Sequence, residues 1–323
     1  MSDFISIGEL LIDFISSEIN LSLKDSKIFI KAPGGAPANV AIAMKRLGFD
    51  SAFIGKVGND CFGEYLISVL QKNNIDTFNL VVDDKVRTTL VFAENRTDGQ
   101  KGLQFYRNPG ADEKLTPDEI NENLIKNGKI FHFGSIGFSK EPCCKAQEKA
   151  LDIARENRLL ISYDPNWRPD VWKDHRIARE IIQKFFIYAN VVKIADEEIE
   201  FVTGFHNPEK ASKWILDQGA EIVIVSMGKR GSFLTTKNFN FYSKSYRVSV
   251  VDTLGAGDAF LAGFLYKIFP VWEKTKSFRE LSKEEAEEAS KFSNAMGALA
   301  CKRVGVIPSL PYLNEINDFL AKY

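Results

Sequence analysis

Cysteine and histidine are scarce in this chain, which has four cysteines and three histidines among 323 residues. The cysteines show no C-x-x-C spacing, and so few of them in so long a chain argue against a disulfide framework or a zinc site. The histidines are scattered, so a catalytic triad or a histidine-based metal site has little material. We expect these side chains to fill the core or the surface.

An excess of charge of either sign is also missing, because 42 Lys and Arg stand against 43 Asp and Glu, a formal charge of −1. Without a basic run, we expect no nucleic acid and no anionic membrane surface as partner. No apolar run approaches the roughly 20 residues that span a bilayer. The N-terminal segment MSDFISIGELLIDF lacks the basic start of a signal peptide. The sequence therefore predicts a soluble, cytoplasmic protein.

Apolar runs of strand length alternate with segments of helical period, which predicts an α/β fold with a mostly parallel sheet of about eight or nine strands. The predicted strands are 4–10, 129–133, 159–163, 191–194 and 222–226, the predicted helices are 37–47, 141–157, 174–188 and 207–217, and 232–235 with 239–248 form a predicted hairpin. Two extended stretches, 14–31 and 87–106, have no helix between their strand-like parts. We expect them to form a small second sheet, a lid on one large domain that covers 1–323.

The segment 249–265, SVVDTLGAGDAFLAGFL, predicts a strand, a glycine-containing turn and then a helix that begins near Gly257. Successive backbone N–H groups of Gly255, Ala256, Gly257 and Asp258 would be unpaired at this helix start, where the helix dipole adds positive potential. Small side chains would let a phosphate approach the backbone closely. The turn is therefore a candidate anion-binding site.

Asp258 is the unusual member of this turn, because a carboxylate repels a neighbouring phosphate. One interpretation is that it caps the helix. The other is that it acts as a general base and accepts the proton of an attacking hydroxyl group, as an aspartate does in many kinases. The turn by itself leaves both interpretations open.

A second glycine-rich segment, 32–41, reads APGGAPANVA. Gly34 and Gly35 would expose backbone to a ligand, and Asn39 offers a donor and an acceptor near the start of a helix. Asp13 follows the first strand, where its carboxylate could accept hydrogen bonds from paired hydroxyl groups. These residues are candidates for binding a polyhydroxy substrate.

Together the two segments resemble the signatures of the ribokinase-like, or PfkB, family of sugar kinases. The first signature matches 34–41 with 45–48, the second matches 252–258, and 54–63 resembles the family's G-x-V-G-x-D-x-x-G segment. The sequence has no G-x-x-x-x-G-K-S/T motif and no G-x-G-x-x-G continuation, which argues against a P-loop enzyme and a dinucleotide-binding dehydrogenase. The resemblance implies a ribokinase-like, doubly wound sheet flanked by helices, with a small β-sheet lid.

By this resemblance, Asp258 is the catalytic base and the amides of 255–258 hold the transferring phosphoryl group. Asp252 and Thr253 would lie near a monovalent-cation site, for which K⁺ is the candidate. Leu254 stands where many members have threonine, and we expect this to be tolerated because the backbone does the binding.

The resemblance also implies an ATP site. The segment 226–231, SMGKRG, resembles a strand and turn along the nucleotide, with Ser226, Gly228 and Gly231 in contact with it. Asn294 matches a position near the adenine pocket. The alternative for Asn294, a polar side chain in mid-helix that faces solvent, stays open.

The segment 193–198, KIADEE, resembles the family's N-x-x-E motif, in which the glutamate helps to hold Mg²⁺ through water. Glu198 matches that glutamate, whereas Ala195 replaces the asparagine. Lys193 is assigned to the ATP site. Because phosphoryl transfer needs a cation for charge neutralisation, we expect MgATP as the phosphoryl donor.

Three local matches favour a fructokinase within the family. They are 8–14 with Asp13, 105–112 with Arg107 approaching the sugar, and 164–172 with Asn166 and Arg168 facing the active site. Arg168 suits the γ-phosphate, because a guanidinium offers a planar fork of donors. The expected reaction is transfer to the 6-hydroxyl of D-fructose.

Alternatives remain open for these residues and for the substrate. Arg107 and Arg168 could be surface ion-pair partners, and Tyr106 and Trp167 simple core residues. A 2-keto-3-deoxygluconate kinase, whose substrate carboxylate Arg107 could bind, and a ribokinase are the alternative enzymes. A catalytically silent member that acts as a binding partner is the non-enzyme alternative. Exposed apolar strands in the lid suggest a homodimer.

Overall fold

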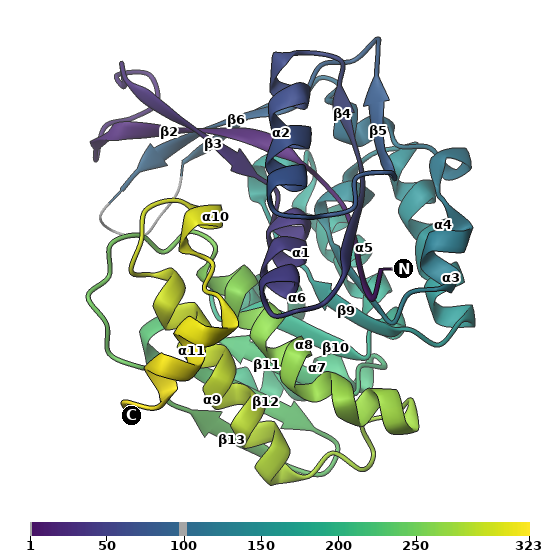
Figure 1. Cartoon of the computed structure of the whole chain (residues 1–323), viewed down its shortest axis with the longest axis vertical. Coiled ribbons are helices and arrows are strands. Elements are labelled where there is room, and N and C mark those ends of the chain that lie inside the picture. Colours follow the sequence, from purple (N-terminus) through teal and green to yellow (C-terminus); the bar gives the residue numbers. More distant parts are fainter. Residues whose placement is uncertain (1, 97–101) are drawn as a thin grey trace.

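Thirteen strands form two sheets in the computed structural model, which describes residues 2–96 and 102–323. The large sheet has nine strands in the order β13-β12-β11-β10-β9-β8-β1-β4-β5 (Figure 1). Its strands are β1 (Phe4–Ile7), β4 (Ser51–Gly58), β5 (Leu80–Asp83), β8 (Ile130–Gly134), β9 (Leu160–Asp164), β10 (Val191–Ala195), β11 (Ile222–Ser226), β12 (Ser232–Thr236) and β13 (Asn240–Ser243). The expected α/β fold with a mostly parallel sheet is confirmed.

Every pairing from β5 to β11 is parallel, and at the other edge β12 runs antiparallel to both of its neighbours, β11 and β13. From β1 the chain first builds β4 and β5 on one side and then β8 to β11 on the other. In such a sheet, ligands bind at the carboxyl ends of the strands, where the strand order reverses. We therefore expect a ligand-binding crevice beyond the carboxyl ends of β1 and β8.

Helices cover both faces because successive strand residues alternate between two buried clusters. Phe4 and Ile130 belong to one cluster, and their neighbours Ile5 and Phe131 to the other. The first face carries α1 (Ala36–Arg46), α2 (Cys61–Lys72), α8 (Ala256–Thr275), α9 (Lys283–Ala300) and α11 (Leu313–Leu320), with α10 (Val306–Ser309) between the last two. The second face carries α3 (Glu122–Lys126), α4 (Cys143–Glu156), α5 (His175–Lys184), α6 (Ile199–Thr203) and α7 (Pro208–Asp217).

Short 3₁₀ helices complete the connections. They are Ala111–Lys114, Pro117–Glu119, Ile136–Ser139, Pro169–Val171, Phe185–Tyr188 and Gly228–Arg230. No helix in the described part of the chain has the length and apolar character that crossing a membrane requires.

The small sheet has the order β3-β2-β6-β7 and projects from the main body. Its strands are β2 (Leu11–Ile19), β3 (Phe29–Gly34), β6 (Leu90–Asn95) and β7 (Leu103–Tyr106). Phe92 packs on Phe14 with ring centroids 5.1 Å apart and on Tyr106 with centroids 5.3 Å apart. Tyr106 is nevertheless 63% exposed, so its interpretation as a core residue is wrong. Residues 97–101, part of the predicted 87–106 stretch, lie outside the described residues.

Three predicted elements are shorter than expected. The strand predicted over 4–10 ends at Ile7, because the chain leaves the large sheet there and enters β2 at Leu11. The helix predicted over 174–188 is α5 followed by a 3₁₀ turn, and the second strand of the predicted hairpin ends at Ser243.

The strand predicted at the start of 249–265 is absent, because no strand lies among the described residues between β13, which ends at Ser243, and α8, which begins at Ala256. The amides of Val251 and Asp252 donate instead to the carbonyl of Cys301 at the end of α9. The other predicted strands and helices agree within two residues at each end.

Candidate active site

The two glycine-rich segments meet at one hydrogen bond, which Asn39 Nδ2 donates to Asp258 Oδ2 over 2.8 Å. Asn39 lies in the first turn of α1, and Asp258 lies in the first turn of α8, 219 residues later. The two helices pack against each other on the same face of the sheet. Their N-termini therefore bring a carboxamide and a carboxylate to one point.

The start of α8 holds backbone donors in a geometry that only glycine readily adopts. Gly255 has φ of 75°, and a Cβ atom there would clash with Val306. The amide of Ala256 donates to the carbonyl of Thr253 over 3.3 Å, so the expectation of four successive unpaired amides is wrong at this residue. Within the described residues, the amides of Gly255, Gly257 and Asp258 have no hydrogen-bond partner. They remain available to an anion, and the helix dipole favours one there.

Asp258 accepts its one hydrogen bond from Asn39 and none from a backbone amide among the residues described, so the capping interpretation is wrong. Burial raises the pKa of Asp258 to about 6, with a further increase from Asp164. The hydrogen bond from Asn39 and the charges of Lys193 and Arg168 act in the opposite direction. A carboxylate with a pKa just below neutrality is ionised at pH 7 and can still accept a proton, as a general base must.

A buried cation lies beside these amides. Lys193 in β10 forms an ion pair of 2.9 Å with Asp164 at the end of β9, and both side chains are almost fully buried. The Lys193 Nζ atom lies 3.1 Å from the position that a Cβ atom on Gly257 would take. Burial lowers the pKa of Lys193, but Asp164 and Glu198 raise it more, so the net pKa is raised and the ammonium stays charged. Asp164 has no predicted role from the sequence, although it opens the segment that holds Asn166 and Arg168.

Glu198 joins the loops that follow β9 and β10. Its Oε1 atom accepts from the amide of Trp167, and Oε2 accepts from the amide of Ala195 over 2.9 Å. Burial raises the pKa of Glu198, as does Asp164, while Lys193 lowers it. Trp167 stacks on Phe201 with centroids 3.7 Å apart and so contributes to the same support.

Arg168 extends from this supported loop. Asn166 has a positive φ of 45°, which makes the tight turn before it. Arg168 Nη1 donates to the carbonyls of Asn166 and Trp167 over 3.3 and 3.1 Å. Arg168 lowers the pKa of both Asp258 and Glu198, so its charge lies near each of them. No ion pair of Arg168 occurs within 2–96 and 102–323, which makes the surface ion-pair alternative wrong.

The small sheet supplies the other wall of the crevice. Asp13 in β2 lies so close to Gly34 at the end of β3 that a Cβ atom on Gly34 would clash with its carboxylate. Gly35 has φ of 116°, and a Cβ atom there would clash with the carbonyl of Glu9. Both glycines are thus required by close approach, and they lie one turn before Asn39.

Arg107, which we predicted to approach the sugar, pairs with two carboxylates of this chain. Its guanidinium is buried and lies 2.9 Å from Asp112 and 3.6 Å from Glu113. Burial lowers its pKa, but the two carboxylates raise it further, and the net pKa is raised. The alternative of a surface ion pair is wrong, because the pair is buried. A direct contact with the sugar stays a prediction.

The predicted nucleotide residues surround the end of β11. Ser226 ends that strand, and Gly228 and Gly231 have φ of 53° and 96° in the turn that follows. A Cβ atom on Gly231 would clash with the carbonyl of Ser243. Asn294 in α9 is buried and donates to Ser243 Oγ over 3.0 Å. The alternative that Asn294 faces solvent is therefore wrong.

Asp252 braces the loop before α8. Its carboxylate accepts from the amides of Leu254 and Gly305 over 3.0 and 2.9 Å. Thr253 lies between these bonds and contributes its carbonyl to Ala256. In the described ranges, no group of three or more His, Cys, Asp or Glu is placed to hold a metal ion. The monovalent-cation site at Asp252 and Thr253 stays a prediction.

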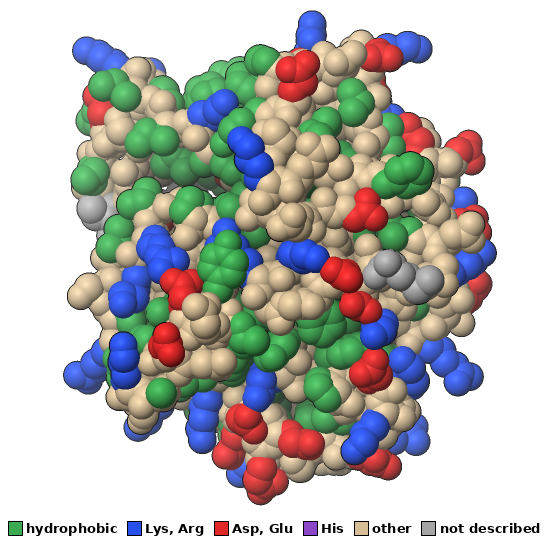
Figure 2. All heavy atoms as spheres, viewed as in Figure 1, with side chains coloured by type: hydrophobic (Ala, Val, Ile, Leu, Met, Phe, Trp, Pro, Cys, Tyr) green, Lys and Arg blue, Asp and Glu red, His purple; other side chains and the backbone are tan. Residues whose placement is uncertain are grey.

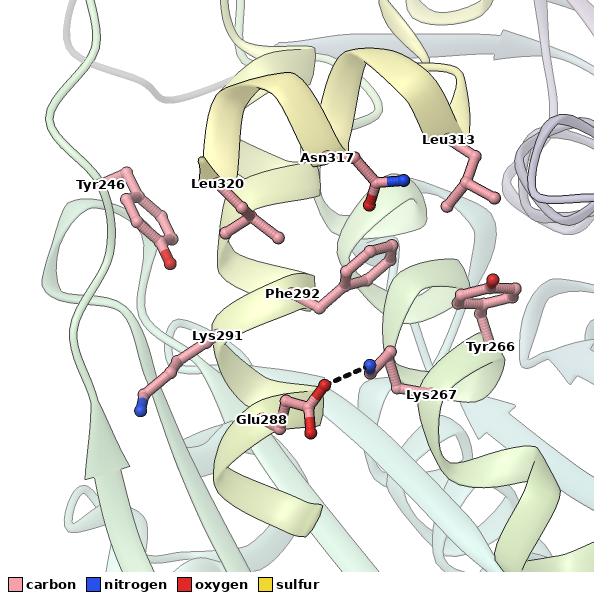
Figure 3. Close-up of a pocket in the computed structure, with 9 residues that line it drawn as sticks. All are labelled: Tyr246, Tyr266, Lys267, Glu288, Lys291, Phe292, Leu313, Asn317 and Leu320. Carbon is pink, nitrogen blue, oxygen red and sulfur yellow. Dashed lines mark hydrogen bonds and ion pairs between the residues drawn. The ribbon is translucent and has the colours of Figure 1, made fainter. Parts of the chain in front are cut away.

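A separate pocket of about 350 Å³ lies between α8, α9 and α11 (Figure 3). It is lined by Tyr246, Tyr266, Lys267, Glu288, Lys291, Phe292, Leu313, Asn317 and Leu320. None of these residues belongs to the predicted site, and Lys267 is already paired with Glu288. The predicted base Asp258 and its partner Asn39 lie elsewhere, at the N-termini of α8 and α1.

The chain matches known carbohydrate kinases over nearly its full length. The model of the pfkB family carbohydrate kinase matches residues 1–313. Fructokinase-1 of Oryza sativa subsp. japonica is 42% identical over 313 residues, which are 97% of this chain and 95% of that protein. The structure of a fructokinase from Xylella fastidiosa with bound ATP matches with 26% identity and a TM-score of 0.89, over 100% of this chain and 99% of that one. A fructokinase double mutant from Vibrio cholerae O395, solved with fructose, ADP and a potassium ion, matches with 30% identity and a TM-score of 0.86, over 99% of both chains.

Proposed function

This chain belongs to the pfkB family of carbohydrate kinases, and we propose that it transfers the γ-phosphate of ATP to the 6-hydroxyl of D-fructose with Asp258 as general base. Its likeness to fructokinases over nearly its full length makes it an ATP-dependent fructokinase, a phosphotransferase that acts on an alcohol group. The observation that carries the mechanism is the hydrogen bond from Asn39 to Asp258 beside the unpaired amides of α8.

In the proposed reaction, the 6-hydroxyl oxygen attacks the γ-phosphorus while Asp258 takes the hydroxyl proton. A new oxygen–phosphorus bond forms, and the bond between the γ-phosphorus and its bridging oxygen breaks, which releases ADP. The amides of Gly255, Gly257 and Asp258 and the ammonium of Lys193 stabilise the charge that develops on the phosphoryl oxygens. Ala256 separates two of these amides without offering its own. Arg168 binds the γ-phosphate with its guanidinium fork.

We assign the remaining residues to two walls of the crevice. The sugar hydroxyls are bound by Asp13, Gly34, Gly35, Asn39 and Asn166, and the nucleotide is bound by Ser226, Gly228, Gly231 and Asn294. The first set lies on or beside the small sheet and the loop after β9. The second set lies around β11 and α9. We propose that the small sheet acts as a lid over the sugar.

The reaction uses a metal ion together with the nucleotide, and we propose Mg²⁺ near Glu198. One oxygen of the neighbouring Asp164, Oδ1, is buried and has no hydrogen-bond partner in the described part of the molecule. An unpaired carboxylate oxygen next to a second carboxylate fits a hydrated Mg²⁺. When bound, the ion would neutralise charge on the phosphates. We place K⁺ near Asp252 and Thr253, where it would support the loop before α8.

A sugar panel tests the proposed substrate. ATP consumption is measured with fructose, ribose, glucose, mannose, tagatose and 2-keto-3-deoxygluconate. We expect the highest kcat/KM for fructose. A keto-acid is disfavoured because Arg107, which would bind its carboxylate, is already paired with Asp112 and Glu113. If kcat/KM is higher for 2-keto-3-deoxygluconate or ribose, that sugar replaces fructose as the proposed substrate. ATP consumption that does not depend on any sugar would favour the non-catalytic alternative.

We also propose a homodimer that forms through the small sheet. Ile19 on β2, Ile28 just before β3 and Ile30 on β3 are 59%, 61% and 58% exposed. Figure 2 shows apolar side chains gathered over this projecting part of the molecule. Burying such a patch is favourable, because exposed apolar surface is costly in water. Sedimentation at micromolar concentration should give a dimer, and Ile28→Asp combined with Ile30→Asp should give a monomer. A monomeric wild type would contradict the proposal.

The cytoplasmic location stays a prediction, which cell fractionation can check.

A further inference from the structure

Four buried charged residues lie where the small sheet joins the rest of the molecule. We call Glu9, Arg107, Asp112 and Glu113 the root cluster. Arg107 pairs with Asp112 over 2.9 Å and with Glu113 over 3.6 Å. Glu9 lies within their field, since Asp112 raises its pKa and Arg107 lowers it.

Each strand of the small sheet is tied to this cluster at its base. Glu9 precedes β2 and Arg107 follows β7. Thr89, just before β6, donates its hydroxyl to Asp112. The amide of Ala36, two residues after β3, donates to Glu9 Oε1 over 3.2 Å. Each of the four crossings of the chain between the small sheet and the main body therefore either carries a member of the root cluster or is hydrogen-bonded to one.

The cluster is costly to bury, so stability alone does not explain it. Glu9, Asp112 and Glu113 are 4%, 4% and 5% exposed. The guanidinium of Arg107 pairs with two of these carboxyl groups, and the third, Glu9, interacts with it electrostatically. Burial raises the pKa of Glu9 to about 7. Buried ion pairs are often replaceable by apolar residues without loss of stability, and their best-attested use is to fix one arrangement among several. The root cluster therefore indicates that the small sheet must be held in one position relative to the main body.

The cluster is adjacent to the sugar side of the crevice. Glu9 binds the first amide of α1, and one turn later the same helix carries Asn39, which binds Asp258. β2 carries Asp13 immediately after the cluster. A shift of the small sheet against α1 would therefore change the distance between Asp13 and Asn39, which we assigned to the sugar.

We infer that the root cluster is a positioning device: it fixes the small sheet against α1, and Arg107 affects fructose binding through this arrangement rather than by touching the sugar. The inference rests on the proposed function for its kinetic readout. It assigns a role to four charged residues that no step of the proposed phosphoryl transfer uses.

A double-mutant cycle on Arg107 and Asp112 separates positioning from contact. We expect Arg107→Met and Asp112→Asn each to raise the KM for fructose about tenfold and to leave the KM for ATP within about twofold, with the double variant no worse than the worse single variant. Arg107→Lys should restore part of the loss, because it keeps the charge but not the fork. Arg155→Met, which removes an exposed arginine of α4 from a loose pair with Asp152, is the matched control and should behave as wild type.

Three outcomes would overturn the inference. A fructose KM that rises in Arg107→Met but stays at the wild-type value in Asp112→Asn would indicate direct contact with the sugar. Losses that multiply in the double variant would show that the two residues act independently. An equal rise in the KM for ATP would indicate a general loss of structure.

Hydrogen exchange provides a readout that needs no catalysis. In Asp112→Asn, the backbone amides of β2, β3 and β6 should exchange faster, while those of β8, β9 and β10 keep their wild-type rates. Uniform acceleration, or no change in the small sheet, would refute the positioning role. If wild type fails to consume ATP with fructose, the proposed function fails, and the exchange experiment still decides on the root cluster.

Discussion

Replacing Asp258 by asparagine is the sharpest test of the catalytic assignment. The carboxamide would keep the size of the side chain and an oxygen that can accept from Asn39, so the crevice should keep its shape. It cannot take a proton from the sugar. Loss of a general base costs about 10²- to 10⁴-fold in rate, or roughly 3 to 5 kcal/mol of transition-state stabilisation. We expect kcat to fall within this range in a coupled assay with fructose and ATP.

The pH profile of wild type should show the same group. With a pKa of about 6, Asp258 is protonated in acid and inactive as a base. The value of kcat/KM should therefore fall about tenfold per pH unit below pH 6 and level off above it. The variant should lack this acid limb. Turnover by Asp258→Asn within about tenfold of wild type, with the limb intact, would refute the assignment.

Stability provides the control for folding. Because burial raises the pKa of Asp258 from 3.8 to about 6, the fold favours its neutral form. The stabilisation from that group is complete below pH 3.8 and is lost as the pH rises through 6, by up to roughly 3 kcal/mol. Asparagine does not ionise, so the variant should melt no lower than wild type at pH 8. Asp217→Asn, which changes an exposed aspartate at the end of α7, should alter neither rate nor melting.

Two further substitutions address the phosphate side. Arg168→Ala should raise the KM for ATP and lower kcat on the order of a hundredfold, because it removes hydrogen-bond donors from the γ-phosphate. The measurement is steady-state kinetics with both substrates varied. A change confined to the fructose KM would reassign Arg168 to the sugar. Lys193→Met should lower the free energy of unfolding by about 3 to 5 kcal/mol, because Asp164 would be left buried without its partner. The same change should move the acid limb of the rate profile to higher pH, since Lys193 lowers the pKa of Asp258; an unshifted limb would show that the two charges do not interact.

Much of the fold could be predicted from the sequence because its patterns are local. Strand β11 falls on the predicted residues 222–226, since a short apolar run bounded by polar residues has few alternatives. The glycines before α8 predict its start within one residue. The end of β1 could not be predicted, because Glu9 and Leu10 are buried like the strand residues before them, and only the path into the small sheet separates the two elements.

The site could be predicted as a set of residues but not as a set of partners. The two glycine-rich segments indicate Asn39 and Asp258 separately, while their mutual hydrogen bond depends on tertiary packing. Asp164 has no signal of its own, because an aspartate before proline is also typical of a turn. The partners of Arg107 are hidden for a similar reason: Asp112 and Glu113 follow it closely in sequence, but their burial with it depends on the fold around them.

The hydrogen bond between Asn39 and Asp258 joins residues 219 positions apart, so during synthesis it can form only after α8 has been made. The residues that we assign to the sugar end at Asn166, whereas Asp258 and the amides that we assign to the phosphate belong to α8, near the end of synthesis. Contacts between such distant segments form late, because a long loop must close first. A chain that ends before α8 would therefore lack Asp258, the proposed catalytic base, and we expect it not to consume ATP.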